Sequence, residues 1–580
     1  MFHIDTFDFN LTTPSQVSHL WHDNNNIGVN WPVVYVINND KEAYVGETVS
    51  VSRRIDQHLQ NEQRQKLTEI RIISDKNFNK SVALDLESFL IKYMASDEKF
   101  ILQNGNNGIH DHNYYNKLEY RDEFRKIWNK LRKMGVVNNT LDEIEQSELY
   151  KYSPYKSLGE EQKDAVTRIL KLLAFYKEDD ISVIVRGGAG TGKTIVAIYL
   201  MKYIADLNDP AWVGGYSFDD EIDTADELEV YLSDNIHMVR KIGLVVPQKS
   251  LKSSLQDVFN SVRLLDKKMV LTPAEVVDDY KKTGKRFDLL IVDEAHRLRC
   301  RYHGNVSHHP TIINRNKYLG LDERMGTELD WIMLCSRNQI FFRDERQTVR
   351  PCDLTADDFM NILRNNYQEP KAQLRLDTQW RCQGGDDYIE YLRDILWNKA
   401  KAFRDIPNYD LKLYTDCNRM YQDIQQKNEE FGLCRMAAGF AWPWDRNNTD
   451  EFTIHIQGHQ YRWNRKYDNW ISSETAPEEI GCIHTLQGYD LNYAGIIIGE
   501  DLKYNPETQT IVSDKTSYFD TLGKAGVSDD PEALKDYLCN IYLTLLTRGI
   551  KGTYIYICDD ALREYFSQFI PMEKGESKSK

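Results

Sequence analysis

The stretch Ile181–Thr194, which reads ISVIVRGGAGTGKT, constrains what this chain can fold into more than any other. A short β-branched run breaks into glycines ahead of an apolar helix pattern, which predicts a strand, a loop and a helix in that order. Glycines let backbone N–H groups close on phosphates, and the helix N-terminus adds positive potential. The spacing GxxxxGK(S/T) therefore predicts a nucleotide-binding loop formed by Gly187, Gly190, Thr191, Gly192, Lys193 and Thr194.

A second motif, Phe287–Arg297 (FDLLIVDEAHR), follows this loop in the chain. Four apolar residues deliver two carboxylates to the carboxyl end of a predicted strand, where open α/β sheets bind ligands. We predict that Lys193 reaches the β- and γ-phosphates and that Thr194 and Asp293 hold Mg²⁺. Glu294 is then placed to polarise the attacking water, so the pattern indicates hydrolysis of a nucleoside triphosphate.

The composition narrows the class of protein. A length of 580 residues predicts about three or four domains, and 41% hydrophobic content is ordinary for a globular protein. No apolar run approaches twenty residues and no basic-then-apolar leader begins the chain, so we expect no membrane partner. Nine dispersed cysteines predict a reducing, cytoplasmic location. A net charge of −16 disfavours indiscriminate binding to nucleic acid but is compatible with a local basic channel.

The first 115 residues read as a small α/β module that follows a short N-terminal arm over residues 1–30. β-rich runs separated by Asn-Asn-Asp predict a hairpin, and the later pattern predicts a helix, a third strand, an amphipathic helix and a Gly/Asn loop. These elements are expected at Pro32–Ile37, Ala43–Val45, Val51–Gln60, Ile70–Ser74, Val82–Met94 and Leu102–Asn116.

This order resembles that of the GIY-YIG nuclease family over residues 31–115. The two tyrosine triplets of the family correspond to VVY, which ends at Tyr35, and YVG, which begins at Tyr44. The first triplet lacks the family's glycine and isoleucine. The family's arginine, histidine, metal-binding glutamate and late asparagine correspond to Arg54, His58, Glu87 and Asn104, with Asn106 and Asn107 as alternatives for the last.

The chemistry of phosphodiester cleavage fits these residue types. The resemblance implies a metal on Glu87, Mg²⁺ or Mn²⁺, and a guanidinium, Arg54, for the charge that develops on phosphorus. It assigns water activation to Tyr35 and Tyr44, which His58 would assist or orient. Each residue alone has an ordinary alternative, as a cross-strand aromatic, a solvated helix residue or half of a surface ion pair. A degenerate module that binds nucleic acid without cutting it also fits the pattern.

Charged helical residues 116–157 are predicted to form a linker helix between the two halves. The following segment KSLGEEQ resembles a motif whose glutamine, here Gln162, reads the adenine edge and gives preference for ATP. The alternative is a capping segment, since Ser157 precedes Glu160 by capping-box spacing.

Three later segments carry weaker signals. The acidic stretch 205–235 is expected to be a surface insertion. Lys249, Ser250 and Lys252 are candidates for phosphate contacts or members of a solvated turn. The cluster Cys300–His309 fits no structural zinc pattern, so we expect a solvated loop there.

Four motifs in the second half resemble those of superfamily-one helicases. The resemblance implies that Gln347 senses the γ-phosphate, that Trp380 stacks on the nucleotide base and that Arg381 contacts the γ-phosphate from a second lobe. A buried tryptophan beside an ion-paired arginine is the alternative for the last two. The motif HTLQGYD contains Gly488, and the last motif supplies Arg548 as an arginine finger that acts on lobe closure.

Aromatic residues of 384–476 allow two interpretations. They either fill the core of a subdomain or offer stacking faces to single-stranded bases. The residues concerned are Trp442, Trp444, Tyr461 and Trp463.

Seven ordered matches over Leu158–Ile557 resemble a superfamily-one helicase core, and most of all the bacterial Schlafen-type (group III) helicase-domain family. The resemblance implies an α/β chain, with a small GIY-YIG-like module and two tandem RecA-like (P-loop) lobes with parallel sheets. The expected divisions are an arm at 1–30, the nuclease-like module at 31–115, a helical linker at 116–157, lobe 1 at 158–348, lobe 2 with an inserted subdomain at 349–570 and a disordered tail at 571–580.

The leading hypothesis is an ATP-dependent helicase or translocase that feeds, gates or positions a metal-dependent nuclease. The alternative is an NTP-driven switch that binds nucleic acid without unwinding it. The expected cofactors are ATP and Mg²⁺, with Mn²⁺ as an alternative at the nuclease site. The expected partners are nucleic acid, DNA in preference to RNA, and either a second copy of the chain or a protein partner in defence against foreign nucleic acid.

Overall fold

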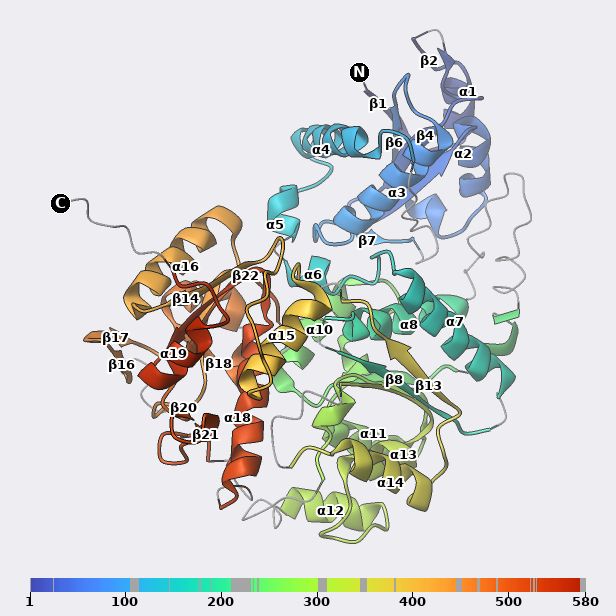
Figure 1. Ribbon diagram of the computed structural model, residues 1–580. Coiled ribbons are helices and arrows are strands. Elements are labelled where there is room, and N and C mark those ends of the chain that lie inside the picture. The colour runs from blue at the N-terminus through green and yellow to red at the C-terminus, as the bar shows by residue number, and fades with distance from the viewer. Residues whose placement is uncertain are drawn as a thin grey trace, which may run out of the picture. The chain divides into compact units, whose positions relative to one another are not determined.

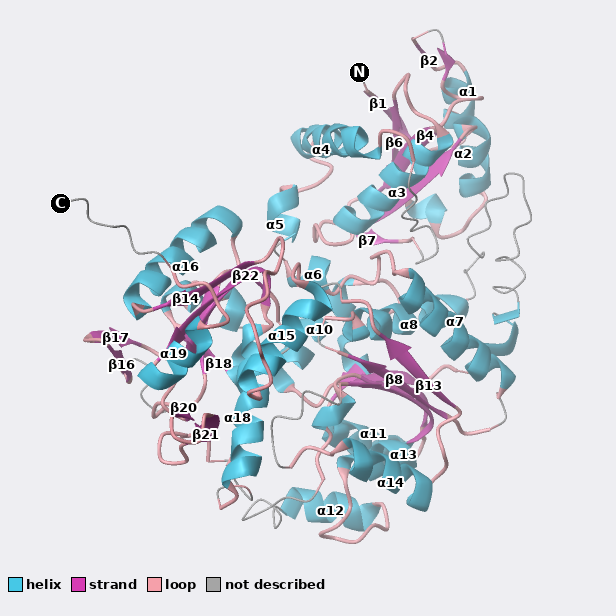
Figure 2. Cartoon of the chain, viewed as in Figure 1, coloured by secondary structure: helices cyan, strands magenta, loops and turns pink. Residues whose placement is uncertain are grey.

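The structure is a computed structural model, and it describes residues 2–23, 25–104, 114–145, 147–176, 179–188, 190–209, 231–232, 234–236, 239–300, 310–344, 352–379, 382–444, 451–466, 470–486, 489–521, 523–524, 527 and 529–573. Figure 1 labels many of their helices and strands, and Figure 2 distinguishes helices from strands by colour. They form three larger sheets of five, six and five strands.

The first sheet has the strand order β1-β6-β4-β5-β7 and an antiparallel centre. Its central strand β4 (Val33–Asn38) is buried along its whole length, which suits its run of β-branched residues. Strand β5 (Glu42–Thr48) pairs with β4 so that Tyr35 lies opposite Gly46. The other strands are β1 (His3–Asp8), β6 (Glu69–Ser74) and β7 (Ile101–Leu102).

Helices accompany this sheet in the predicted order. They are α1 (Thr13–Ser18), α2 (Val51–Leu59), the 3-10 turn η1 (Arg64–Lys66) and α3 (Lys80–Met94). Helix α3 begins at Lys80 because the Asn79 side chain accepts a hydrogen bond from the Val82 backbone N–H. Helix α3 packs on β4 and β5, and Figure 1 shows it beside this sheet. The expected hairpin, third strand and two helices are therefore present.

Residues 1–30 differ from the expected arm. Strand β1 pairs antiparallel with β6, from His3 opposite Ser74 to Asp8 opposite Glu69. A short hairpin of β2 (Trp21–His22) and β3 (Asn25–Asn26) follows α1. The sequence HIDTFD does not have the apolar pattern of a buried strand, so it does not predict β1. An edge strand pairs along one side only and leaves its side chains partly exposed, which allows this polar composition.

The segment expected as a linker packs on the nuclease-like module. Helix α4 (Lys117–Lys133) contacts α3, and its buried Trp128 meets Phe89 at a ring-centroid distance of 6.4 Å. The Asp97 carboxylate accepts hydrogen bonds from the backbone N–H groups of Asn138 and Asn139. Two short helices follow, α5 (Leu141–Glu145) and α6 (Glu148–Lys151). The apolar stripe that predicts α4 therefore attaches it to α3.

The second sheet has the order β10-β9-β11-β12-β8-β13 and is parallel in its pairs β11–β12, β12–β8 and β8–β13. Its strands are β8 (Ser182–Gly187), β9 (Ile242–Val245), β10 (Val270–Leu271), β11 (Phe287–Val292), β12 (Ser336–Arg343) and β13 (Ala372–Leu376). The helices and 3-10 turns in the same part of the chain are α7 (Glu160–Phe175), α8 (Lys193–Leu207), α10 (Lys249–Ser261), η3 (Lys267–Met269), α11 (Pro273–Thr283), η4 (Ala295–Arg297), α12 (Pro310–Tyr318), α13 (Glu328–Cys335) and α14 (Ala356–Asn366).

Strand β13 extends lobe 1 beyond the expected limit at residue 348. It pairs with β8 from Ala372 opposite Val183 to Leu376 opposite Gly187. Its sequence AQLRL alternates, and only Leu376 is buried. This is the pattern of an edge strand and not of a parallel strand covered on both faces, so the boundary could not be read from residue types.

The third sheet has the strand order β14-β22-β19-β15-β18 and is parallel throughout. Its strands are β14 (Asp410–Tyr414), β15 (Arg435–Ala438), β18 (Ile480–Cys482), β19 (Leu491–Ile498) and β22 (Gly549–Ile557), with hairpins β16 (Ile454–Ile456)–β17 (His459–Tyr461) and β20 (Leu502–Asn505)–β21 (Thr510–Ser513). Its helices and turns are α15 (Gly385–Leu396), α16 (Cys417–Phe431), η6 (Trp470–Ser472), η7 (Ala476–Glu478), α17 (Ile483–Leu486), α18 (Pro531–Leu546) and α19 (Asp560–Ser567).

The aromatic residues of 384–476 belong to the core of this third sheet. Tyr461 and Trp463 are buried in it, and Trp442 and Trp444 pack against it while partly buried. All four aromatic side chains therefore contribute to the core of a subdomain, which is the first of the two interpretations given above. An α/β chain with a small module and two lobes with parallel sheets is confirmed.

All nine cysteines are free thiols, as their dispersion predicts. Within the described ranges, no helix is both long and apolar enough to cross a membrane.

Candidate active sites

The predicted nucleotide loop lies between β8 and α8. Gly190 and Gly192 have φ angles of +82° and +81°, which glycine alone adopts at low cost. The Lys193 ammonium is buried and donates hydrogen bonds to carbonyl oxygens of the loop, the nearer at 2.7 Å on Gly188. Its Nζ also lies 4.0 Å from Oδ2 of Asp344. The lysine charge is therefore held at the carboxyl ends of β8 and β12.

Close contact fixes the remaining loop residues. A Cβ atom on Gly187 would lie 2.5 Å from Oγ1 of Thr191, so no larger residue fits there without a shift. The Thr191 hydroxyl donates a hydrogen bond to the Gly188 carbonyl over 3.1 Å. Thr194 lies in the first turn of α8.

Two carboxylates follow β11. Asp293 is fully buried, and Glu294 adopts a left-handed backbone with φ of +51°, a conformation that clusters at functional sites. Oε2 of Glu294 lies 3.0 Å from Nε2 of His296, whose Nδ1 accepts a hydrogen bond from the Asp344 backbone N–H. Burial raises the pKa of Glu294, but the contact with His296 and the charge of Lys193 outweigh this and hold it well below its ordinary value. Glu294 is therefore ionised at neutral pH.

The donor set at this site fits Mg²⁺. Among the described residues, no three His, Cys, Asp or Glu side chains gather into a metal cage. Asp293 offers one buried carboxylate at the end of β11, and the metal-binding role of Thr194 stays a prediction. Mg²⁺ in phosphate sites takes few protein oxygens and completes its shell with phosphate and water.

Several predicted residues lie outside the described residues, and their roles stay predictions. They are Gln347, Trp380, Arg381 and Gly488, the side chains of Lys249 and Ser250, most of the acidic stretch 205–235, residues 301–309 of the histidine cluster and residues 574–580 of the tail.

Arg548 occupies an internal position. It is 2% exposed, and its Nε and Nη1 donate hydrogen bonds to the carbonyl oxygens of Thr544 and Tyr489 over 3.1 and 3.2 Å. An arginine finger presents its guanidinium to a phosphate. Arg548 would have to exchange both hydrogen bonds to do so, and that role stays a prediction.

Two other candidates make structural contacts. Oε1 of Gln162 accepts a hydrogen bond from the Gly159 backbone N–H at the start of α7, so this pair forms the cap in place of Ser157 and Glu160. Both oxygens of Glu275 pair with Nζ of Lys252, at 2.7 and 2.6 Å. A phosphate would have to compete with this ion pair, and the phosphate contact of Lys252 stays a prediction. Adenine recognition by Gln162 stays a prediction.

Four residues of the GIY-YIG pattern converge beside the first sheet. Oη of Tyr35 lies 2.8 Å from Nε2 of His58 and accepts a hydrogen bond from Nε of Arg54 over 3.4 Å. The Tyr44 ring meets the His58 ring edge-on, with 5.0 Å between their centroids. Because these side chains come from β4, β5 and α2, the hairpin and the helix after it assemble the cluster.

The contact between Tyr35 and His58 is excluded from solvent, with exposures of 0% and 1%. Burial raises the pKa of Tyr35 well above its ordinary value. Burial, followed by the charges of Arg64 and Arg54, lowers the pKa of His58 well below its ordinary value. Both side chains are therefore neutral at pH values near 7.

The glycine of the second triplet, Gly46, is required by the space available beside Tyr35. It lies opposite Tyr35 across β4 and β5, and a Cβ atom at this position would lie 2.3 Å from Oη of Tyr35. No side chain can occupy this position without moving the phenol. Val33, which stands where the first triplet of the family has glycine, is instead buried in β4.

Glu87 of α3 lies beside Glu47 of β5. The Glu87 carboxylate accepts a hydrogen bond from the Glu47 backbone N–H, and burial, then the Glu47 charge, raises its pKa to about 8. Oε1 of Glu47 pairs with Nζ of Lys80 at 2.7 Å, whereas its Oε2 is buried without a hydrogen-bond partner among the described residues. Adjacent carboxylates with an orphaned oxygen fit a divalent cation. The motif identifies Glu87 alone, and the structure adds Glu47.

The Asn104 amide binds the backbone of β5. Its Oδ1 accepts a hydrogen bond from the Val45 N–H over 3.0 Å, and its Nδ2 donates to the Val45 carbonyl over 2.8 Å. Both ends of the amide are used in holding β5, and the catalytic role of Asn104 stays a prediction. Asn106 and Asn107 lie outside the described residues.

Arg64 joins this cluster although no motif indicates it. Its Nη1 lies 2.7 Å from Nδ1 of His58, and its Cζ lies 3.8 Å from the ring centroid of Tyr44. It comes from η1, a single turn after α2. Such a turn carries no sequence pattern that relates it to a site.

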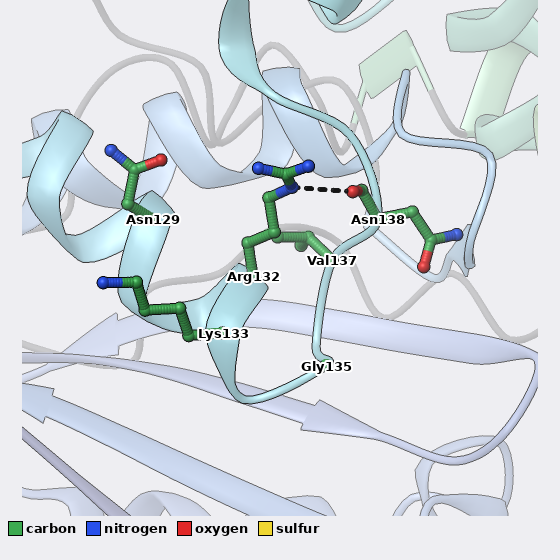
Figure 3. A pocket seen from close by; sticks show the side chains of 6 residues that line it. All are labelled: Asn129, Arg132, Lys133, Gly135, Val137 and Asn138. Atoms are coloured by element: carbon green, nitrogen blue, oxygen red, sulfur yellow. Dashed lines mark hydrogen bonds between the residues drawn. The ribbon is translucent and has the colours of Figure 1, made fainter.

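A surface pocket of about 650 Å³ lies at the end of α4 and is drawn in Figure 3. Nε of Arg132 donates a hydrogen bond to the Asn138 carbonyl over 2.9 Å. Basic residues in the last turn complement the helix dipole. None of the predicted site residues lines this pocket, and we assign it no chemistry. Its lining residues are Asn129, Arg132, Lys133, Gly135, Val137 and Asn138.

Comparison with known protein families finds matches for both halves. The family described as Schlafen group 3, DNA/RNA helicase domain matches residues 181–559, and the GIY-YIG catalytic domain matches residues 32–99. The uncharacterized protein YPL245W of Saccharomyces cerevisiae is 24% identical over 448 residues, which cover 70% of this chain and 90% of the relative.

Two solved helicases show a distant likeness. The Pif1 helicase from Bacteroides, in complex with ADP-AlF3 and ssDNA, has a TM-score of 0.28 and 12% identity over 72% of this chain and 95% of its own. The Pif1 helicase from Candida albicans has a TM-score of 0.29 and 9% identity over 71% of this chain and 99% of its own. The family of this chain is assigned from the family matches alone, and not from these two solved structures.

Proposed function

Since this chain belongs to the Schlafen group 3, DNA/RNA helicase domain family, we propose that it is an ATP-dependent helicase or translocase whose motor serves a metal-dependent endonuclease. The matches make it an enzyme of the ATPase and helicase class with a GIY-YIG endonuclease domain. The proposal adds that both activities act on one nucleic acid.

The motor half rests on one observation, that Lys193 and the carboxylates after β11 and β12 gather at the carboxyl ends of a parallel sheet. Lys193 is placed to bind the β- and γ-phosphates. Ionised Glu294 accepts a hydrogen bond from water and orients it toward the γ-phosphate. Thr194 and Asp293 would hold Mg²⁺, which when bound offsets the phosphate charge.

In the nuclease half, Tyr35 and Tyr44 are candidates to take a proton from the attacking water, and Arg54 binds the charge that develops on phosphorus. Glu87 and Glu47 would hold Mg²⁺ or Mn²⁺, which when bound polarises the scissile phosphate. Ionisation of Glu87 beside Glu47 is unfavourable without a cation. Metal binding and loss of the Glu87 proton are therefore expected to be linked.

The proposed partner is nucleic acid, with DNA in preference to RNA. A nuclease joined to a motor suits removal of foreign nucleic acid, so we include a role in defence, either as an assembly of several copies or with a protein partner. Free thiols at all nine cysteines support a reducing, cytoplasmic location.

The test measures ATP hydrolysis and cleavage side by side on single- and double-stranded DNA and RNA, with Mg²⁺ or Mn²⁺. We expect single strands to stimulate hydrolysis in the parent, and Lys193→Ala and Glu294→Gln to abolish it. Cleavage should disappear in Glu87→Ala. If no nucleic acid stimulates hydrolysis, the motor proposal is wrong. If Glu87→Ala cuts like the parent, cleavage occurs elsewhere in the chain.

A second candidate function is an NTP-driven switch that binds nucleic acid without unwinding it. The internal hydrogen bonds of Arg548 favour it, because this arginine must leave them before it can act on a phosphate. Hydrolysis without strand displacement on substrates with varied overhangs would support the switch. Processive unwinding would rule it out.

A further inference from the structure

We propose that Arg64 is a positioning residue that fixes the tautomer of His58, so that His58 donates a hydrogen bond to Tyr35 and does not act as its base. The proposal rests on the proposed nuclease function only where it gives Tyr35 a catalytic task. The tautomer itself is a property of the folded chain.

The chemistry of the guanidinium sets the direction of the hydrogen bond between Arg64 and His58. Nη1 of Arg64 lies 2.7 Å from Nδ1 of His58. A guanidinium carries N–H donors, has no acceptor and stays charged in proteins. Nδ1 must therefore offer a lone pair, because two N–H groups that face each other at this distance repel.

The proton of His58 then lies on the other ring nitrogen. A neutral imidazole carries one N–H, so an accepting Nδ1 implies a protonated Nε2. Nε2 lies 2.8 Å from Oη of Tyr35, which must accept this hydrogen bond. Imidazolium is disfavoured because it would also place an N–H against Arg64.

Tyr35 consequently receives two hydrogen bonds at one oxygen, from Nε2 of His58 and from Nε of Arg54 over 3.4 Å. Because burial keeps Tyr35 a neutral phenol near pH 7, it can take a proton from water only after its own proton has left to solvent, and the two donors stabilise the phenolate that remains. Nε2 already holds a proton, so His58 offers no lone pair to the Tyr35 hydroxyl. Without Arg64 both tautomers are accessible, and this division of roles is lost.

The surroundings hold Arg64 in this place. Its Cζ lies 3.8 Å from the ring centroid of Tyr44, which is a cation–π contact. Its backbone N–H donates to the carbonyl and to Oδ1 of Asn61, over 3.0 and 3.2 Å. The Arg64 guanidinium therefore stacks on the Tyr44 ring and at the same time donates a hydrogen bond to His58, which lies beside Tyr35.

NMR can test the tautomer directly. With ¹⁵N-labelled histidine in the full chain, long-range proton–nitrogen spectra separate Nε2–H from Nδ1–H and from imidazolium, and the His58 signals are those lost in His58→Gln. We expect Nε2–H in the parent and in Arg64→Lys, which again offers donors only. Arg64→Gln, whose amide oxygen can accept, should shift His58 toward Nδ1–H. Nδ1–H or imidazolium in the parent would overturn the proposal.

Cleavage gives a second readout. A glutamine at position 58 can donate a hydrogen bond but cannot take up a proton. We expect His58→Gln to cut within about tenfold of the parent and His58→Ala to lose about 100-fold, as for a lost oxyanion donor. Equal losses in both variants would overturn the donor role.

Controls separate this proposal from folding and from the nuclease assignment. Arg53→Ala removes an exposed arginine from the same helix as His58 and should change neither readout. Thermal unfolding of each variant detects misfolding. If the parent cuts nothing, the nuclease proposal fails, while the NMR spectra still decide the tautomer.

Discussion

Both candidate active sites hold a buried histidine ring against an oxygen, but they orient it by different means. His58 faces a phenol and His296 faces a carboxylate. In each ring Nδ1 accepts a hydrogen bond. The donor is the Arg64 side chain in the nuclease-like site and the Asp344 backbone N–H in the nucleotide site.

The two sites therefore differ in the source of the hydrogen-bond donor, which is the backbone after a paired strand in one site and one side chain in the other. The backbone donor at position 344 follows β12, which is paired in register with β11, so any non-proline residue there supplies the N–H. The donor to His58 is instead the side chain of one residue, Arg64, on the short 3-10 turn η1. The orientation of His296 therefore depends mainly on the sheet, whereas the orientation of His58 depends on one side chain.

The largest effect is expected from Lys193→Ala. Loss of the loop lysine removes the charge placed for the phosphates, so ATP hydrolysis should fall by about 10³-fold or more. Cleavage of a short substrate without ATP should be unchanged if the two sites are independent. Steady-state phosphate release and gel-based cleavage measure both. Lys171→Ala, at an exposed position of α7, is the control.

A reciprocal loss is expected from Arg54→Ala. This variant removes the guanidinium that contacts Tyr35 and that would bind charge on phosphorus, so cleavage should fall by about 10²- to 10³-fold. ATP hydrolysis in the same preparation should be unaffected. A parallel fall in hydrolysis would show that the two sites are coupled. Arg53→Ala, at the exposed neighbouring position, should cut normally.

Gly46→Ala should have an intermediate effect. The added Cβ would lie 2.3 Å from Oη of Tyr35, so the phenol must move away from His58 and Arg54. We expect roughly tenfold slower cleavage and a stability loss of about 1–3 kcal/mol from overpacking. Gly135→Ala, where a Cβ meets no atom within 4 Å but φ is +70°, controls for glycine loss alone. Full activity in Gly46→Ala would mean that the phenol position is not critical.

The smallest effect concerns stability and pH. The Glu87 pKa is raised to about 8 from an ordinary 4.5, so its ionisation costs stability as pH rises through that window and costs none below it. Glu87→Gln should therefore stabilise α3 by on the order of a few kcal/mol above pH 8 and have little effect near pH 4. Hydrogen exchange of α3 measures this.

Divalent metal should reverse the order of stability between Glu87→Gln and the parent. Mg²⁺ or Mn²⁺ bound by Glu87 and Glu47 stabilises the folded parent, whereas the amide of Glu87→Gln is a poor ligand. Added metal should thus slow exchange of α3 in the parent only. Equal slowing in both proteins would place the metal elsewhere.

The sequence alone predicted the parts of this protein whose residues are contiguous. The strand, glycine loop and helix around Lys193, and the carboxylates after β11, could be recognised because local geometry and chemistry lie within one short stretch. The order of elements from β4 to α3 could also be read, because buried strands and an amphipathic helix have strong periodicities.

Edge elements and long-range contacts could not be read in this way. Strands β1 and β13 each pair along one side only and keep many side chains exposed, so the sequence did not indicate that these two segments add edge strands to the first and second sheets. Asn104, expected to be catalytic, binds the backbone of a strand 59 residues away. Lys252 pairs with a carboxylate 23 residues away, which its own segment does not indicate.

The tertiary structure alone decided the electrostatics of the nuclease-like site. Arg64 reaches His58 from a separate turn, and Glu47 lies beside Glu87 only because α3 packs on β5. A proton's position and a carboxylate's charge depend on donors and charges within a few ångströms, whatever their distance along the chain. Residue types and spacing therefore named the candidate groups, and only folding set which of them accept a hydrogen bond, donate one or carry charge.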